Sequence, residues 1–214
     1  TIPSKAYLYA LPYKFYKDFR IRRYGFHGTS HKYLAQQAAR LMKKDIEEIN
    51  IITLHLGNGC SLCAVEKGQS IDTSMGMSPL AGVMMGTRTG DMDPAVVGYL
   101  MKQTGQDIDK LETVFNQQSG LKGICGENDL RDIHNAVEKG DSYAKLALDM
   151  FCYQVKKYIG AYTAALGYID AIVFGGGVGE NDSVVRKKIL DGLSGFGIRI
   201  DQVQNASKQS LPKS

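Results

Sequence analysis

Residues 51–66 read Ile51-Ile52-Thr53-Leu54-His55-Leu56-Gly57-Asn58-Gly59-Cys60-Ser61-Leu62-Cys63-Ala64-Val65-Glu66. β-Branched and other apolar residues fill this stretch up to Leu56 and resume directly after Gly59, a pattern that predicts two strands joined by a tight turn. Residues 69–73 follow a second turn at Lys67-Gly68 and are predicted as a third, shorter strand. We therefore expect a β-hairpin with a glycine-rich tip at residues 57–59.

The tip of this hairpin carries two glycines, which can adopt φ > 0 and leave backbone N–H groups uncovered. A phosphate can approach such N–H groups without meeting a Cβ atom, so the tip is a candidate phosphate loop. The alternative is purely structural, because Asn-Gly is also a preferred hairpin turn that binds nothing. Further candidate anion-binding segments elsewhere in the chain would favour the phosphate loop over a purely structural turn.

The composition is that of an ordinary globular chain, with 43% apolar and 22% charged residues among 214. The net charge of +4 is spread along the sequence, which gives little reason to expect nucleic acid or membrane lipid as a partner. No apolar run is long enough to span a bilayer and no signal-peptide pattern opens the sequence, so we expect a soluble, cytoplasmic protein. The first residue is Thr1 and not Met, which suggests a processed chain or a piece of a longer one.

The four cysteines are too few and too scattered for a disulfide scaffold. Cys60 and Cys63 form a C-x-x-C pair within a predicted strand, where a spacing of three residues places them on opposite faces. We therefore expect neither a metal site nor a redox site from the cysteines.

A histidine between glycines, His27, stands just before a predicted helix that runs to about Met42. Thr29 and Ser30 are the N-cap candidates for this helix. A histidine at a helix N-terminus is well placed to contact a bound anion, although an exposed loop histidine without function is the alternative. The predicted buried stripe of the helix consists of Leu34, Ala38 and Leu41.

Residues 74–93 show little regular pattern and end where Asp93 as N-cap and Pro94 as first residue predict a helix of about ten residues. Loops of this length are usually functional or disordered, and this one is too apolar to be disordered. Arg88 lies in its glycine-bracketed part, where a guanidinium can donate several hydrogen bonds to a phosphoryl group. A surface arginine without function is again the alternative.

The C-terminal part of the sequence predicts a helix near residues 107–115, a turn-rich piece at 123–132, and a long helix that starts at Asp141 or Ser142. A buried strand at 170–174 leads into a glycine loop at 175–181 and another helix, an arrangement that binds nucleotide phosphate or ribose. The loop lacks G-x-G-x-x-G spacing, which argues against a dinucleotide-binding fold. A last strand is expected at 197–201.

The long helix has an apolar stripe that must lie across a sheet. The stripe consists of Ala144, Leu148, Phe151, Val155, Ile159, Tyr162 and Leu166.

We divide the chain into three parts on these patterns. Residues 1–24 are an irregular, aromatic-rich lead-in whose aromatic side chains we expect to be packed and not to stack on nucleic acid. Residues 25–205 form the nucleotide-binding domain. Residues 206–214 form a polar tail, and fraying is expected after Gln204.

Together, several of these segments resemble the acetate kinase family from about Pro3 to about Asn205, and their order makes the resemblance specific. The matching segments are His27-Gly28-Thr29-Ser30-His31, His55-Leu56-Gly57-Asn58-Gly59, Asp72-Thr73-Ser74-Met75-Gly76, Gly86-Thr87-Arg88-Thr89-Gly90-Asp91-Met92-Asp93-Pro94, Asp129-Leu130-Arg131-Asp132 and Gly177-Val178-Gly179-Glu180-Asn181.

The resemblance implies an α/β fold of the ribonuclease-H-like type shared by acetate kinase, sugar kinases, Hsp70 and actin, with a mixed sheet flanked by helices. It also implies ATP/ADP and Mg²⁺ as cofactors, acetate or another short-chain carboxylate as substrate, and a homodimer. By the resemblance, His27 and Arg88 stabilise the transition state, as fixed donors to the charge that a transferred phosphoryl group spreads over its oxygens. The implied nucleotide-binding residues are the phosphate loop His55, Leu56, Gly57, Asn58 and Gly59, the nucleoside neighbours Asp129, Leu130 and Arg131, and the adenosine loop Gly177, Val178, Gly179, Glu180 and Asn181.

The resemblance covers only the second half of an acetate kinase. The first-half phosphate loop, the arginine expected to hold the carboxylate, the catalytic aspartate and the magnesium-linked glutamate have no counterpart here, so we expect a fragment that is inactive alone and whose metal ligands lie in the missing parts. Two alternatives remain open. One is a propionate or butyrate kinase, and the other is a non-catalytic nucleotide-binding or dimerisation module whose interface could include the stripe at 144–166.

Overall fold

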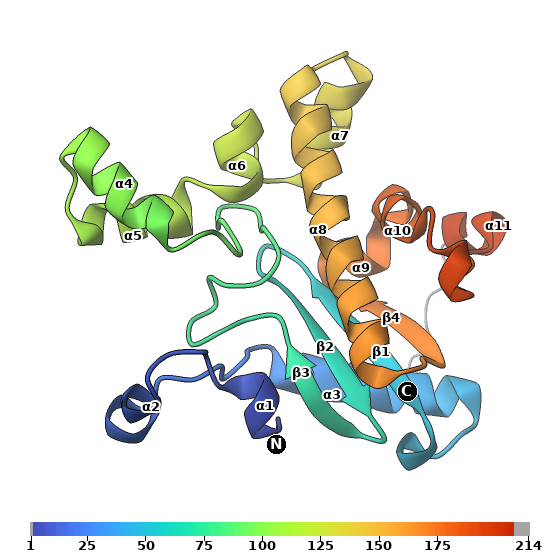
Figure 1. Cartoon of the computed structure of the whole chain (residues 1–214). Coiled ribbons are helices and arrows are strands. Elements are labelled where there is room, and N and C mark those ends of the chain that lie inside the picture. Colours follow the sequence, from blue (N-terminus) through green and yellow to red (C-terminus); the bar gives the residue numbers. More distant parts are fainter. Residues whose placement is uncertain (1, 208–214) are drawn as a thin grey trace.

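A four-stranded mixed sheet forms the centre of the molecule, with helices on both faces (Figure 1). The structure is a computed structural model that describes residues 2–207. The strand order is β3-β2-β1-β4, formed by β1 (Asn50–Leu56), β2 (Cys60–Glu66), β3 (Gln69–Thr73) and β4 (Ala171–Gly175). The predicted hairpin, the third strand and the α/β class are confirmed.

The pairing makes β1 the strand on which the sheet is built. β1 pairs antiparallel with β2, with His55 opposite Ser61, and parallel with β4. Parallel pairing requires a crossover connection, which here runs through all the helices between β3 and β4. β4 is paired only on its β1 side among the described strands, and most of its residues are half-buried.

Alternation along the hairpin divides its side chains between two cores. Ile52, Leu54 and Leu62 face the larger core. Ile51, Cys63 and Val65 face the smaller core under α3 (Gly28–Met42), which packs on β1 and β4. Cys60 lies in the larger core, so the prediction that Cys60 and Cys63 occupy opposite faces is confirmed.

The longest helix, α8 (Ser142–Leu166), covers the other face of the sheet (Figure 1). Of the two predicted caps, Asp141 and Ser142, the structure has Asp141, whose carboxylate accepts from the N–H groups of Tyr143 and Ala144. All seven predicted stripe residues are buried in the larger core. Because the fold itself covers this stripe, it offers no room for a dimer interface, and that expectation was wrong.

α3 begins earlier than its predicted caps. His27, in the left-handed conformation with φ 60°, is the N-cap, and it makes no side-chain capping bond. Thr29 and Ser30 lie inside the first turn, so they are not caps. Leu41 is 62% exposed, because the buried stripe turns toward Ala35, Ala38 and Ala39. After α3 the chain passes through η1 (Ile46–Glu48) into β1.

The lead-in is more regular and less buried than predicted. It contains two short helices, α1 (Ser4–Tyr7) and α2 (Tyr13–Phe19), which begin directly after Pro3 and Pro12. Tyr13 and Phe19 are 56% and 67% exposed. The Arg23 guanidinium ties the lead-in to the sheet by donating to the carbonyls of Thr73 and Ser74 at 2.9 and 2.8 Å.

Residues 74–93 contain no helix or strand, as predicted, and they pack against α8. Met75, Met84 and Met85 of this loop are buried in the larger core, and the Met84 N–H donates to Gln154 Oε1 on α8 at 2.7 Å. The helix that follows, α4 (Ala95–Thr104), is ten residues long as expected, although Pro94 occupies the N-cap and the Asp93 carboxylate accepts from the Ala95 N–H. α5 (Ile108–Gln117) confirms the next predicted helix.

Two predicted loops are partly helical. The turn-rich piece at 123–132 begins within α6 (Gly120–Cys125) and ends in α7 (Leu130–Glu138). The glycine loop after β4 folds as α9 (Gly176–Asn181), followed by α10 (Ser183–Leu190) with Asp182 as its cap.

The predicted strand at 197–201 is absent. After η2 (Ser194–Phe196) the chain runs through Gly197 without pairing to the sheet and enters α11 (Gln202–Ala206), which Asp201 caps. Of the predicted polar tail, residues 208–214 lie outside the described residues. Within residues 2–207, no helix has the length and apolarity needed to cross a membrane.

We predict that Gly176→Ala strongly destabilises the protein. Gly176 has a φ of 76°, and a Cβ atom there would lie 2.5 Å from the Leu56 carbonyl oxygen, where α9 approaches the end of β1. Left-handed strain and overpacking together predict a loss of roughly 2–5 kcal/mol in the free energy of unfolding, measured with urea. Gly177→Ala is the matched control, because a Cβ atom there meets nothing within 4 Å. Equal stability of the two variants would contradict this account of the α9–β1 contact.

A second prediction concerns His31, which is 5% exposed and bonds Thr53 of β1 and Ser61 of β2 at 2.8 Å each. Burial, with smaller effects of His27 and His55, lowers the pKa of His31 to about 3. Below about pH 6.5, His31 is protonated in the unfolded chain but stays neutral in the folded chain. The free energy of unfolding therefore falls as the pH falls.

Between pH 7 and pH 5 the His31 contribution to this loss is about 2 kcal/mol. His31→Gln, which cannot titrate, should therefore lose about that much less stability over the same interval than the unchanged chain. Urea unfolding of both proteins at the two pH values gives the difference. An identical pH dependence would show that His31 is not held neutral in the fold.

Candidate active site

Three predicted nucleotide-binding segments converge on one cavity of about 810 Å³. They come from the hairpin tip, from the start of α7 and from α9, which are far apart in sequence. Eight of the predicted residues line this cavity: Gly57, Asn58, Asp129, Leu130, Arg131, Gly177, Val178 and Asn181. The hairpin tip thus lies beside both later segments in a single hollow.

The other predicted nucleotide-binding residues support the cavity or lie at its edge. Leu56 and Gly179 are buried in the interior and do not line the cavity. His55, Gly59 and Glu180 do not line the cavity. Gly59 instead lies next to His27 and Arg88, and the His55 ring stacks on the His27 ring.

The hairpin tip is open because two of its three residues are glycines without a side chain, and not because these glycines are left-handed. None of Gly57, Asn58 and Gly59 has a positive φ, so the expectation of φ > 0 at the tip was wrong. A Cβ atom on Gly59 would lie 3.4 Å from Arg88 Nη1 and 3.4 Å from His27 Cε1. Glycine at this position therefore keeps a space that the guanidinium and the imidazole both face.

The two predicted catalytic side chains, His27 and Arg88, are far apart in the sequence. The tertiary fold brings both of them next to Gly59. The His27 ring also stacks on the His55 ring, with centroids 4.1 Å apart. Burial, His55 and Arg88 lower the pKa of His27, so that its neutral form prevails. Burial likewise lowers the pKa of His55, against the opposing effect of Glu180.

The position of Arg88 depends on α6. Its own turn is closed by the Met85 N–H, which donates to the Arg88 carbonyl at 3.0 Å. The N–H groups of Leu121 and Lys122 then donate to the carbonyls of Met85 and Gly86 at 2.9 Å each. The guanidinium Nη1 donates to the Pro79 carbonyl at 3.2 Å, while Nε and Nη2 have no hydrogen-bond partner among the described residues. These two groups remain available to a ligand.

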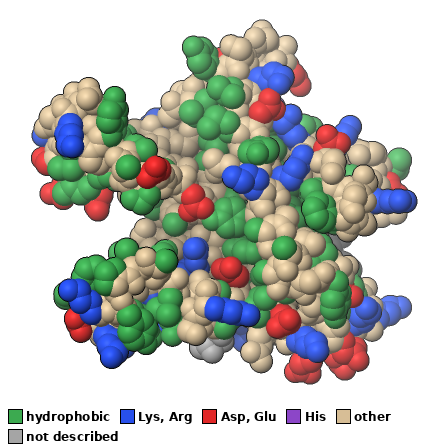
Figure 2. Space-filling model, in the orientation of Figure 1, with side chains coloured by type: hydrophobic (Ala, Val, Ile, Leu, Met, Phe, Trp, Pro, Cys, Tyr) green, Lys and Arg blue, Asp and Glu red, His purple; other side chains and the backbone are tan. Residues whose placement is uncertain are grey.

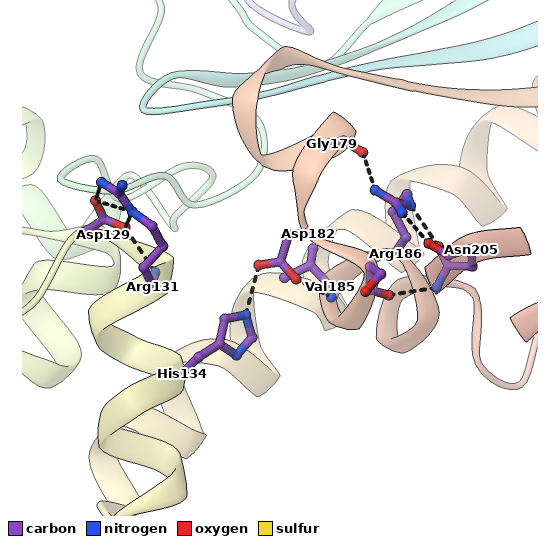
Figure 3. A network of polar contacts seen from close by, with 9 residues as sticks. Asp129, Arg131, His134, Gly179, Asp182, Val185, Arg186 and Asn205 are labelled. Carbon is purple, nitrogen blue, oxygen red and sulfur yellow. Dashed lines mark hydrogen bonds and ion pairs between the residues drawn. The ribbon is translucent and has the colours of Figure 1, made fainter. Parts of the chain in front are cut away.

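At the mouth of the cavity, Asp129 and Arg131 form an ion pair (Figure 3). Asp129 caps α7 by accepting from the Arg131 N–H at 2.9 Å, and it also accepts from the guanidinium Nε at 3.0 Å. These hydrogen bonds lower the pKa of Asp129 to about 2. The Arg131 side chain is 88% exposed and lies along the rim.

The cavity includes residues that the sequence analysis missed. His134 Nε2 on α7 contacts Asp182 Oδ2 at 2.7 Å, and Asp182 also caps α10, so this pair joins two walls of the cavity (Figure 3). Arg186 holds the end of α9 by donating to the carbonyls of Gly179 and Glu180. The other missed lining residues are Gly86, Leu121, Asn128, Phe151, Ser183 and Val184. Histidine and aspartate 48 residues apart give no local sequence signal of their pairing.

A second cavity of about 580 Å³ lies between α3 and the edge of β2 and β3. None of the predicted nucleotide-binding residues lines it. On the face drawn in Figure 2, acidic and basic side chains are interspersed, and neither sign gathers into one block. Among residues 2–207, no three His, Cys, Asp or Glu side chains are grouped so that they could hold a metal ion.

Comparison with known proteins identifies the family. The profile of the Acetokinase family matches residues 1–214. The acetate kinase of Oleidesulfovibrio alaskensis is 55% identical over 213 residues, which make up 100% of this chain and 53% of that protein. The chain spans about half the length of the curated relatives that it matches.

Solved structures of acetate and propionate kinases also match this chain. A crystal structure of Porphyromonas gingivalis acetate kinase matches with a TM-score of 0.94 and 43% identity, covering 96% of this chain and 52% of that one. A propionate kinase from Francisella tularensis matches with a TM-score of 0.93 and 45% identity, covering 96% and 53%. The predicted fold class and the resemblance are confirmed, and this chain belongs to the acetokinase family.

Proposed function

We propose that this chain is the nucleotide-binding part of an acetate kinase, which reversibly transfers a phosphoryl group between ATP and acetate and yields acetyl phosphate and ADP. The observation that carries the proposal is the convergence of three segments on one cavity whose hairpin-tip end adjoins His27 and Arg88. Membership in the acetokinase family supports the same reaction class.

In this proposal each segment has its own part of the nucleotide. The phosphate loop at 55–59 meets the phosphates, residues 129–131 lie beside the nucleoside, and residues 177–181 hold the adenosine. The volume of the cavity, about 810 Å³, is within the range of small-molecule and cofactor sites. His134 and Asp182 stiffen the wall between the last two segments.

Phosphoryl transfer needs donors that are fixed before the reaction, because charge spreads over the equatorial oxygens of the moving group. Arg88 Nη1 lies 3.4 Å from the place of a Gly59 Cβ atom, and Nε and Nη2 of the same guanidinium make no hydrogen bond with the described residues. His27 supplies a neutral imidazole at the same place. The open space above Gly59 is where the phosphoryl oxygens would lie.

Magnesium enters the proposal only as the partner of the nucleotide phosphates. The described residues contain no cluster of metal ligands, so they do not fit a protein-held Mg²⁺ site, and no step of the mechanism is assigned to one.

We place the nucleotide-binding unit at residues 25–205 and the protein in the cytoplasm, and we propose a homodimer. The exposed apolar side chains Val96 and Tyr99, three residues apart on one face of α4, form a surface on which a second copy could pack.

A propionate kinase is the second candidate, because the Francisella tularensis propionate kinase superposes as well as the acetate kinase does. One methylene group in a pocket changes discrimination by only about 1–3 kcal/mol. The ratio of kcat/KM for acetate and propionate therefore decides between the two acids. A chimera in which this chain replaces the matching part of the Oleidesulfovibrio alaskensis acetate kinase tests the residues of this chain only, because the arginine expected to hold the carboxylate lies outside it.

We predict that Mg-ADP stabilises the 214-residue chain, with a melting temperature that rises with the logarithm of ligand concentration. Gly177→Leu is the matched variant. Gly177 lines the cavity and a Cβ atom there meets nothing within 4 Å, so leucine should fill the cavity without disturbing the fold. It should melt normally without nucleotide and lose the shift. A chain that melts cooperatively and does not respond to Mg-ADP would contradict a nucleotide site formed by these 214 residues alone.

We also predict that Arg88→Ala in the chimera lowers kcat by about three powers of ten or more, because a fixed donor to the transferred group is lost. The affinity for ADP should change little, since Arg88 does not line the cavity. Arg199→Ala is the control, because Arg199 is exposed and makes no hydrogen bond or ion pair with residues 2–207. Near-normal turnover in Arg88→Ala would remove Arg88 from the mechanism.

A further inference from the structure

Behind His27 lies a chain of hydrogen-bonding side chains that the proposed reaction does not yet use. Thr53 Oγ1 contacts His31 Nδ1, His31 Nε2 contacts Ser61 Oγ, and Ser61 Oγ contacts His27 Nδ1, each at 2.8 Å. Thr53 and Ser61 are 0% exposed and His31 is 5% exposed. The three inner groups are therefore shielded from water, and only His27 reaches the site.

The direction of the protons in this chain can be worked out from the donors present. The Ser61 hydroxyl has one proton, so it can donate to only one of its two imidazole partners and must accept from the other. The pKa of His31 is lowered to about 3 by burial, so His31 is neutral and carries a single ring proton.

Thr53 then decides between the two directions. Its hydroxyl makes no hydrogen bond other than that with His31 among the described residues. If Thr53 donates to His31 Nδ1, then His31 Nε2–H donates to Ser61, and Ser61 donates to His27 Nδ1. The reverse direction leaves the buried Thr53 proton without an acceptor, which disfavours it by roughly tenfold or more.

We propose that Thr53, His31 and Ser61 are positioning residues that fix His27 as its Nε2–H tautomer, so that the neutral imidazole presents an N–H donor at the open tip of the phosphate loop. The proposal rests on the proposed function for the identity of the acceptor, a phosphoryl oxygen. Nε2 lies 3.5 Å from the place of a Gly59 Cβ atom, on the side that Arg88 also faces. The opposite tautomer would place a lone pair there and repel an anionic oxygen.

The neighbouring imidazole is held differently and serves as an internal reference. His55 Nδ1 contacts Ser30 Oγ at 2.8 Å and takes no part in the Thr53–His31–Ser61 chain. Ser30→Ala should therefore leave the His27 tautomer unchanged. Ser61→Ala breaks the chain next to His27, whereas His31→Gln keeps an amide N–H that can donate to Ser61 and His31→Leu does not.

The test is ¹⁵N–¹H correlation NMR of the histidine rings in the 214-residue chain, with the four histidines assigned through single substitutions. We expect the unchanged chain, Ser30→Ala and His31→Gln to show a protonated Nε2 and an unprotonated Nδ1 on His27. Ser61→Ala and His31→Leu should show averaged shifts from both tautomers. A protonated Nδ1 on His27 in the unchanged chain, or a spectrum that Ser61→Ala does not alter, would overturn the proposal.

Kinetics of the chimera add a second readout. Ser61→Ala should lower kcat roughly 10- to 100-fold with KM for the nucleotide within about twofold, the pattern of a lost outer hydrogen bond to a reacting group. Equal losses in His31→Gln and His31→Leu would indicate a merely structural role and overturn the proposal. A chimera without any acetate kinase turnover would count against the proposed function, while the ring spectra would still decide the tautomer.

Discussion

The pairing of β1 with β2 determines which side chains meet around the hairpin, and the rest of the structure depends on it. With His55 opposite Ser61, strand alternation sends Leu54 and Leu62 into the larger core and sends Thr53 and Ser61 toward α3. A slip by one residue would exchange the two faces. The same register that completes the core therefore also assembles the polar groups that contact His27 and His31.

The features predicted from sequence are those whose signals are local. The hairpin and α8 follow from periodicity within a few residues, and the cap of α8 follows from a single aspartate. Local sequence marked the hairpin tip, His27, Arg88 and the glycine loop as anion-binding candidates, but their grouping into one site was predictable only through the resemblance to a family, because the segments lie far apart in sequence. Eight of thirteen expected nucleotide-binding residues line the cavity, since motifs mark backbone segments and not the side chains that face a ligand.

The failures have a common physical origin in tertiary contacts. Leu41 satisfies the helical period but is exposed, because the buried stripe of α3 runs through Ala35, Ala38 and Ala39 and continues at Met42. Residues 197–201 were predicted as a strand but pair with neither edge strand of the sheet, β3 or β4. The turn that carries Arg88 is set by N–H donors from α6, more than thirty residues later in the chain, where the sequence alone predicts only a loop.

The two catalytic candidates, Arg88 and His27, both face the open space next to Gly59, but they offer different kinds of hydrogen-bond donor. Arg88 brings a permanent positive charge on a turn held by backbone hydrogen bonds. A second cation on His27 would face repulsion from that charge, which is one reason why the pKa of His27 is lowered. A neutral imidazole can still serve as a donor, but only if its single proton is on the nitrogen that faces the ligand. The buried hydroxyls and His31 behind it meet that requirement without adding any charge to the site.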